Sequence, residues 1–102
     1  MEIKSAITGL SALANDTRLA AFRLLVQAGP AGMAAGELAR RLAVRPNTLT
    51  AALTILSHAE LVTARRAGRS VIYAARYETM RALLAFMTEN CCANSLPDAP
   101  GA

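Results

Sequence analysis

Apolar residues recur at helical spacing through the first part of the chain and predict two helices. A first amphipathic helix is predicted over residues 3–14, from the spacing of Ile3, Ile7, Leu10 and Ala14. The segment Asn15-Asp16-Thr17 supplies a cap for a second helix over residues 18–28. Its inward side chains are expected to be Leu19, Phe22, Leu25 and Val26. Gly29 and Pro30 are expected to end it.

Two further helices are predicted close together, separated by a short turn. The first is short, over residues 37–43, and buries Leu38, Ala39 and Leu42. The second runs over residues 47–59, with Pro46 at its start, where a missing N–H costs nothing. One face of this second helix is apolar and is formed by Leu49, Ala52, Leu53 and Leu56. The opposite face is small or polar and carries Asn47, Thr48, Thr50, Ala51 and Thr54.

The pattern then changes to a hairpin and returns to a helix. Residues 61–64 and 70–73 read as two strands around the glycine-bearing turn of residues 65–69. A last helix is predicted over residues 77–92, with one stripe formed by Met80, Leu83, Leu84, Met87 and Cys91. The predicted fold is mainly α with a small β-hairpin (α-α-α-α-β-β-α), the order of a winged helix-turn-helix. Residues 1–92 form the domain, and residues 93–102 are expected to be a disordered tail.

Length and charge restrict the classes of function. A chain of 102 residues forms one domain. No uncharged stretch reaches the ~18 residues that a membrane helix needs, so no membrane association and a cytoplasmic location are expected. One histidine and the absence of a phosphate-binding glycine loop make an enzyme a poor interpretation. The net charge is +4, and residues 40–76 hold seven arginines and a single acid, Glu60. Such clustering is typical of a nucleic-acid surface.

The charged segment coincides with the predicted helix-turn-helix, and this favours binding to double-stranded operator DNA. The second helix of the motif reads bases in the major groove from its N-terminal half. Its candidates are Asn47, Thr48, Thr50 and Ala51. The hairpin arginines are expected at phosphates or in the minor groove, and they are Arg65, Arg66 and Arg69. Arg45, with Arg40 and Arg41, is expected to hold backbone phosphates. The alternative is a module of the same fold that contacts proteins and not DNA.

Three segments carry a resemblance to the ArsR/SmtB family of metalloregulators. They are LANDTRLAAFRLL (13–25), GELARRLAVRPNTLTAALTILSHAELV (36–62) and RRAGRSVIYAA (65–75). The resemblance implies a winged-helix repressor that binds its operator as a homodimer, joined through the first and last helices, and is released by an inducer. Apolar stripes on both of those helices also leave surface to bury, which favours a dimer.

Two adjacent cysteines, Cys91 and Cys92, stand at the end of the last predicted helix. The stretch RALLAFMTENCC (81–92) resembles an arsenic-responsive subgroup whose inducer binds a Cys-Cys pair at this place. Trivalent arsenic is a soft centre that thiolates match well. The resemblance therefore implies that Cys91 and Cys92 bind arsenite, methylarsenite or antimonite as the inducer, with no cofactor required.

The subgroup carries a third cysteine a few residues later, and residues 93–96 contain none. Arsenite or antimonite would then retain a hydroxide, or a cysteine of the other subunit would contribute. A methylated arsenical has two exchangeable positions and needs only two thiolates. Three other interpretations stay open: a zinc site of four thiolates across a two-fold axis, a redox switch through an inter-subunit disulfide, and two small apolar residues at a helix end. A disulfide within the pair is not expected, because neighbouring Cα atoms lie about 3.8 Å apart, below the usual window of about 4.4–6.8 Å.

Overall fold

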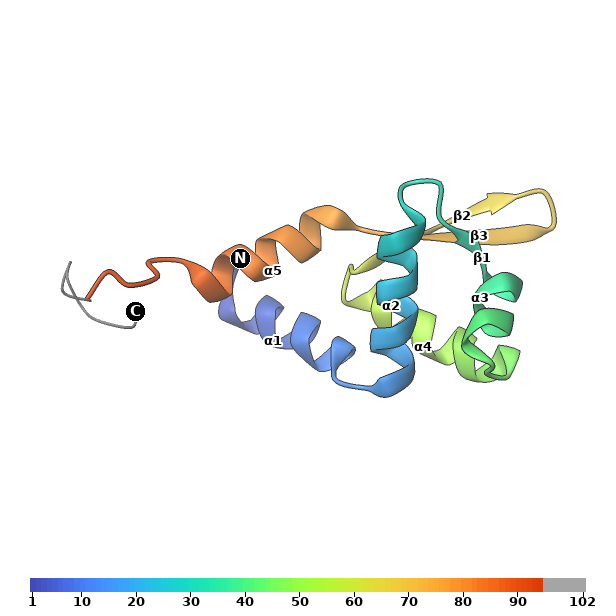
Figure 1. Ribbon diagram of the computed structural model, residues 1–102, viewed down its shortest axis with the longest axis horizontal. Coiled ribbons are helices and arrows are strands. Elements are labelled where there is room, and N and C mark those ends of the chain that lie inside the picture. Colours follow the sequence, from blue (N-terminus) through green and yellow to red (C-terminus); the bar gives the residue numbers. More distant parts are fainter. Residues whose placement is uncertain (95–102) are drawn as a thin grey trace.

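Residues 1–94 are described in the computed structural model, and they form the predicted winged helix-turn-helix (Figure 1). The elements are α1 (Ile3–Leu13), α2 (Asp16–Ala28), β1 (Met33–Ala34), α3 (Ala35–Leu42), α4 (Pro46–His58), β2 (Val62–Ala67), β3 (Ser70–Ala75) and α5 (Tyr77–Thr88). Of the predicted tail, Ala93 continues a turn in which its N–H donates to Asn90 O at 3.1 Å. The rest of the tail, residues 95–102, lies outside the described residues.

The sheet has three strands where the sequence predicted two. β1 pairs antiparallel with β3, through Met33 opposite Tyr73, which gives the order β1-β3-β2. The hairpin is also longer than predicted. Arg65 and Arg66 lie within β2, and only Gly68 and Arg69 form the turn. Gly68 has a φ of +64°, as the first position of a type II′ hairpin turn requires.

The helix-turn-helix is fixed by its buried leucines. Leu49, Leu53 and Leu56 of α4 are almost fully buried, together with Leu25 of α2 and Leu38 of α3. These leucines, with Leu61 and Val62 from the start of β2, belong to one core cluster. All four predicted inward positions of α4 are buried. The core therefore holds α4 by one face and leaves the opposite face to solvent.

Local signals mark the starts of α2 and α4, although α2 and α3 each begin two residues earlier than predicted. The Asn15 side chain accepts a hydrogen bond from the backbone N–H of Arg18 at 3.0 Å and caps α2. Pro46 is the first residue of α4. Gly29 follows α2 with a φ of +82°. One predicted inward residue was wrong: Leu19 of α2 is 44% exposed, because it lines an open pocket, together with Leu13 and Leu83, that nothing in this chain fills.

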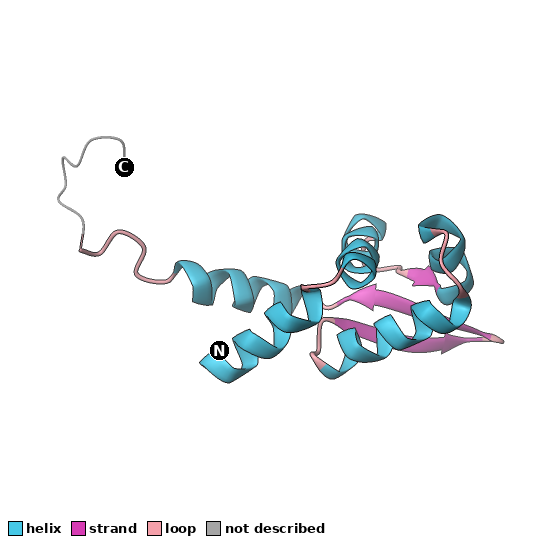
Figure 2. Cartoon of the chain, turned by 90° about the horizontal axis from the view of Figure 1, so that it is seen from below, coloured by secondary structure: helices cyan, strands magenta, loops and turns pink. Residues whose placement is uncertain are grey.

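The last helix is shorter than predicted, and this moves the cysteines. α5 ends at Thr88, and Glu89 is extended with φ −60° and ψ 142°. Cys91 therefore does not continue the apolar stripe of α5, and both cysteines lie in the turn that follows it. Figures 1 and 2 place α1 and α5 at one end of the molecule and the turn between β2 and β3 at the other. No helix among the described residues is long and apolar enough to span a bilayer.

Replacing Leu53 with alanine should lower the free energy of unfolding by about 2–5 kcal/mol, because it leaves a cavity in the core beneath α4. The neighbouring Thr54 is exposed, so Thr54→Ala should change it by no more than about 0.5 kcal/mol. Urea unfolding at one fixed protein concentration measures both. Equal losses for the two variants would show that α4 is not held by its leucine face.

Candidate nucleic-acid interface and thiol pair

The solvent face of α4 carries the predicted base-reading residues. Asn47, Thr48, Thr50 and Ala51 are all exposed. The hydroxyl of Thr50 donates to Pro46 O at 2.9 Å, so its proton is used within the helix and its oxygen can still accept a hydrogen bond. An exposed asparagine can pair with the edge of adenine, and a methyl group can contact that of thymine. This face therefore carries short side chains and is open to solvent. Both properties are needed if the helix is to come close to the edge of a base.

The beginning of α2 lies beside this face. Asn15 and Thr17 line a shallow hollow together with Thr48 and Ala51. Sequence reasoning assigned Asn15 only to capping and did not find this neighbourhood. The contact joins segments more than thirty residues apart, and no periodicity within either segment reveals it.

The three arginines before α4 differ in whether an acidic side chain compensates their charge. Arg41 pairs with Glu37 one turn earlier in α3, at 3.0 Å, so part of its charge is compensated. Arg40 and Arg45 are exposed, and within residues 1–94 neither has an acidic partner. Arg45 directly precedes Pro46 at the start of α4. It therefore places a free cation next to the base-reading positions, where a phosphate would pass.

The three hairpin arginines were predicted to form one group, but they lie on different sides of the hairpin. Arg65 and Arg66 are consecutive in β2, so their side chains point to opposite faces of the sheet. The Nη2 of Arg65 donates to Ala31 O at 3.1 Å. Arg69 lies in the turn itself, and all three side chains are exposed. Arg76, the last arginine of the basic segment, pairs with Glu60 at 3.4 Å.

The two cysteines are exposed, unoxidised and in contact. Their Sγ atoms lie 3.1 Å apart. Positive φ angles at Asn90 (+57°) and Cys92 (+67°) shape the turn that brings them together. The hydrogen bond to Cys92 raises the pKa of the Cys91 thiol, and a smaller desolvation effect raises it further. The residues described in the structure contain no cluster of three or more His, Cys, Asp or Glu side chains that could hold a metal ion.

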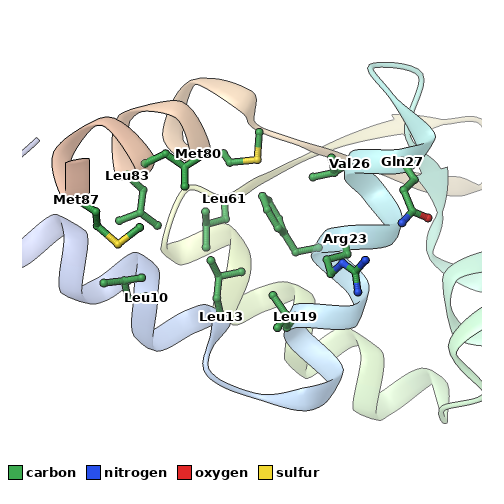
Figure 3. Close-up of a pocket in the computed structure, with 12 residues that line it drawn as sticks. Leu10, Leu13, Leu19, Arg23, Val26, Gln27, Leu61, Met80, Leu83 and Met87 are labelled. Atoms are coloured by element: carbon green, nitrogen blue, oxygen red, sulfur yellow. The ribbon is translucent and has the colours of Figure 1, made fainter. Parts of the chain in front are cut away.

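The end of the molecule that carries the cysteines also exposes a large apolar surface. The large apolar side chains that α1 and α5 expose are Ile3, Ile7, Leu10, Leu84 and Met87, between 42% and 63% accessible. We call these five residues the α1–α5 seam. An open pocket of about 450 Å³ adjoins it, between α1, α2 and α5 (Figure 3). Leu13, Leu83 and Met80 point into this pocket, and Arg23 and Gln27 lie at its α2 edge.

Comparison with known proteins identifies the fold and the family. Residues 13–65 match the family model described as a helix-turn-helix domain. No curated protein matches the chain. An ArsR-like transcriptional regulator from Rhodococcus sp. RHA1 is similar in structure, with a TM-score of 0.75 and 26% identity over 90% of this chain and 83% of that one.

Two further solved structures are similar. The homodimeric winged helix-turn-helix DNA-binding domain of Mb0332 from Mycobacterium bovis has a TM-score of 0.70 and 26% identity, over 84% of this chain and 78% of that one. A protein described as a possible transcriptional regulator for arsenical resistance has a TM-score of 0.69 and 25% identity, over 78% of this chain and 79% of that one.

Proposed function

Since the chain belongs to the helix-turn-helix domain family and is similar in structure to an ArsR-like transcriptional regulator, we propose that it is a homodimeric repressor released from its operator by a trivalent arsenical. The observation that carries DNA binding is the uncovered face of α4 between free arginines. Arg45 stands at the beginning of that helix, and Arg66 and Arg69 stand in the hairpin. In this proposal α4 enters the major groove and reads bases, and the arginines hold phosphates on either side of it.

The α1–α5 seam supports the dimer. Leu83 is the only buried residue of α5, so one copy of the chain covers little of this helix. A helix of twelve residues is marginal in water without packing partners. The similar domain of Mb0332 is homodimeric, and a two-fold axis through the seam would give this chain the same state. Two copies of α4 would then meet half-sites about 10–10.5 base pairs apart, and we expect an inverted-repeat operator.

Cys91 and Cys92 are the proposed inducer site. Two thiols whose sulfur atoms lie 3.1 Å apart can bind one soft atom together. Each step exchanges one bond: an Sγ–H and an As–OH become an Sγ–As bond and a water molecule. Two such exchanges saturate methylarsenite, which keeps its methyl group, whereas arsenite keeps one hydroxide. The arsenical-resistance regulator among the similar structures favours this inducer class over others.

The position of the pair supports a route from inducer to DNA. The cysteines follow α5 directly, at the same end of the molecule as the α1–α5 seam. A ligand that bridges them reshapes the turn after α5, and in the dimer this changes how the two copies pack. The two α4 helices then no longer match the spacing of the half-sites. By linkage, operator DNA must weaken inducer binding by the same factor.

A DNA-release titration tests the function directly. The wild-type protein should bind duplex operator DNA and should be released by methylarsenite, arsenite or antimonite. The double variant Cys91→Ser with Cys92→Ser should bind the same DNA within about twofold, because exposed replacements change little, and should not be released. Fluorescence anisotropy of a labelled duplex measures both properties.

The same titration separates the rival interpretations. Release by zinc alone indicates a metal site across the two-fold axis. Release by peroxide that a dithiol reverses indicates a redox switch. Loss of DNA binding in the double variant means that the pair is structural. A wild-type protein that does not retard duplex DNA at any salt concentration contradicts the repressor and favours a protein-contact module.

The pH dependence of binding also distinguishes an arsenical from zinc. Exchange of thiols on As–OH releases water and no net proton, so arsenical affinity should be flat between roughly pH 6 and pH 8. Zinc needs thiolates and displaces their protons, so its log K should rise by about 4 per pH unit for a site of four thiols. The hydrogen bond with Cys92, and to a smaller extent desolvation, raise the pKa of Cys91 and so favour its protonated thiol over this range. Calorimetry at three pH values measures both; an arsenical affinity that rises like that of zinc would contradict the proposed exchange.

A further inference from the structure

One side-chain contact ties the hairpin to a distant loop. The Nη2 of Arg65, in β2, donates to the carbonyl oxygen of Ala31, 34 residues earlier, at 3.1 Å. Ala31 lies in the loop between α2 and β1. Because the strands are ordered β1-β3-β2, the Arg65 side chain must cross the middle strand to reach it. The contact therefore joins β2, which is an edge strand of the sheet, to the segment that leads into α3.

The two faces of the hairpin give neighbouring arginines different surroundings. Arg66 lies four residues after Val62 in β2, so the two side chains share one face of the sheet, and Val62 is part of the buried core. Arg65 lies on the other face, opposite Ile72 of β3. Arg66 is thus on the helix side of the sheet, and Arg65 is on the outer side, where its guanidinium is occupied by Ala31.

The loop that receives Arg65 is itself closely fitted. Gly32 has a φ of +73°, and a Cβ at this position would overlap the carbonyl oxygen of Tyr73 in β3. Only glycine allows the loop to approach the middle strand so closely. At the next residue the chain enters β1, and it then enters α3, the first helix of the helix-turn-helix. A hydrogen bond to this loop therefore sets the hairpin relative to the DNA-reading helices.

We infer that Arg65 is a positioning residue, which fixes the angle of the hairpin against the helix-turn-helix, whereas Arg66 and Arg69 supply the phosphate contacts. This inference rests on the proposed DNA binding and divides roles among residues that the sequence grouped together. It departs from the expectation that Arg65 contacts DNA.

Salt dependence separates the two roles. Each phosphate contact adds about 0.9 to the slope of log affinity against log salt concentration, because it releases a counterion. A residue that only positions the hairpin changes the affinity by the same factor at every salt concentration and leaves the slope unchanged. Loss of one phosphate contact instead changes the ratio of wild-type to variant affinity by about 3.5-fold between 50 and 200 mM salt.

The matched variants are Arg65→Met and Arg66→Met, which keep an unbranched stem similar to that of arginine and remove the guanidinium with its charge and its donors. Arg65→Met should lower the affinity for operator DNA by about two- to tenfold, the range that one hydrogen bond can contribute, with an unchanged slope. Arg66→Met should lower the slope by about 0.9. A reduced slope in Arg65→Met, or no change in affinity, would overturn the inference.

A second measurement tests the contact without DNA. The carbon-13 chemical shift of the Ala31 carbonyl should move in Arg65→Met and stay unchanged in Arg66→Met. An unmoved Ala31 carbonyl in both variants would also overturn the inference. If the wild-type protein fails to bind duplex DNA while the Ala31 signal responds as expected, the contact stands and the proposed function fails. The two failures are therefore distinguishable.

Discussion

The packing of α5 is the constraint on which the arrangement depends. This helix buries one residue, Leu83, against its own chain and leaves Leu84 and Met87 about half exposed. The exposed side chains of α1 extend the same apolar surface. A surface of this kind requires a partner, and a second copy supplies an identical one across a two-fold axis. The dimer would in turn set the distance between the two copies of α4. It would also determine which surface of the partner lies next to the thiol pair.

The core and the DNA-reading surface are two sides of one helix. The buried leucines of α4 fix its position, because a closely packed core leaves little room for the helix to move. Its outer face carries only short side chains, so the backbone can approach the floor of a groove. In the proposed complex the arginines around it contact phosphates, and they contribute affinity and little sequence information. Specificity in this account therefore comes from a few short side chains, held rigidly by residues that never touch DNA.

The sequence predicted most elements because their signals are local. The leucine spacing of α4, the proline at its start and the asparagine cap of α2 each act within one turn of helix. β1 was missed because two residues show no alternation, and only pairing with Tyr73 and Ile72 makes them a strand. The end of α5 was misplaced because Met87 and Cys91 keep helical spacing and no glycine or proline intervenes. The stop lies at Glu89 and Asn90, and asparagine is a weaker signal for a left-handed residue than glycine. The Arg65 contact was invisible because it joins strand and loop across 34 residues.

Sedimentation equilibrium of the wild-type protein and of Leu84→Glu tests the central claim most directly, since the substitution places a charge in the α1–α5 seam and leaves the core and the arginines untouched. We expect a wild-type dimer at micromolar concentration and a Leu84→Glu monomer. A wild-type monomer, or a Leu84→Glu dimer as stable as the wild type, would contradict that expectation.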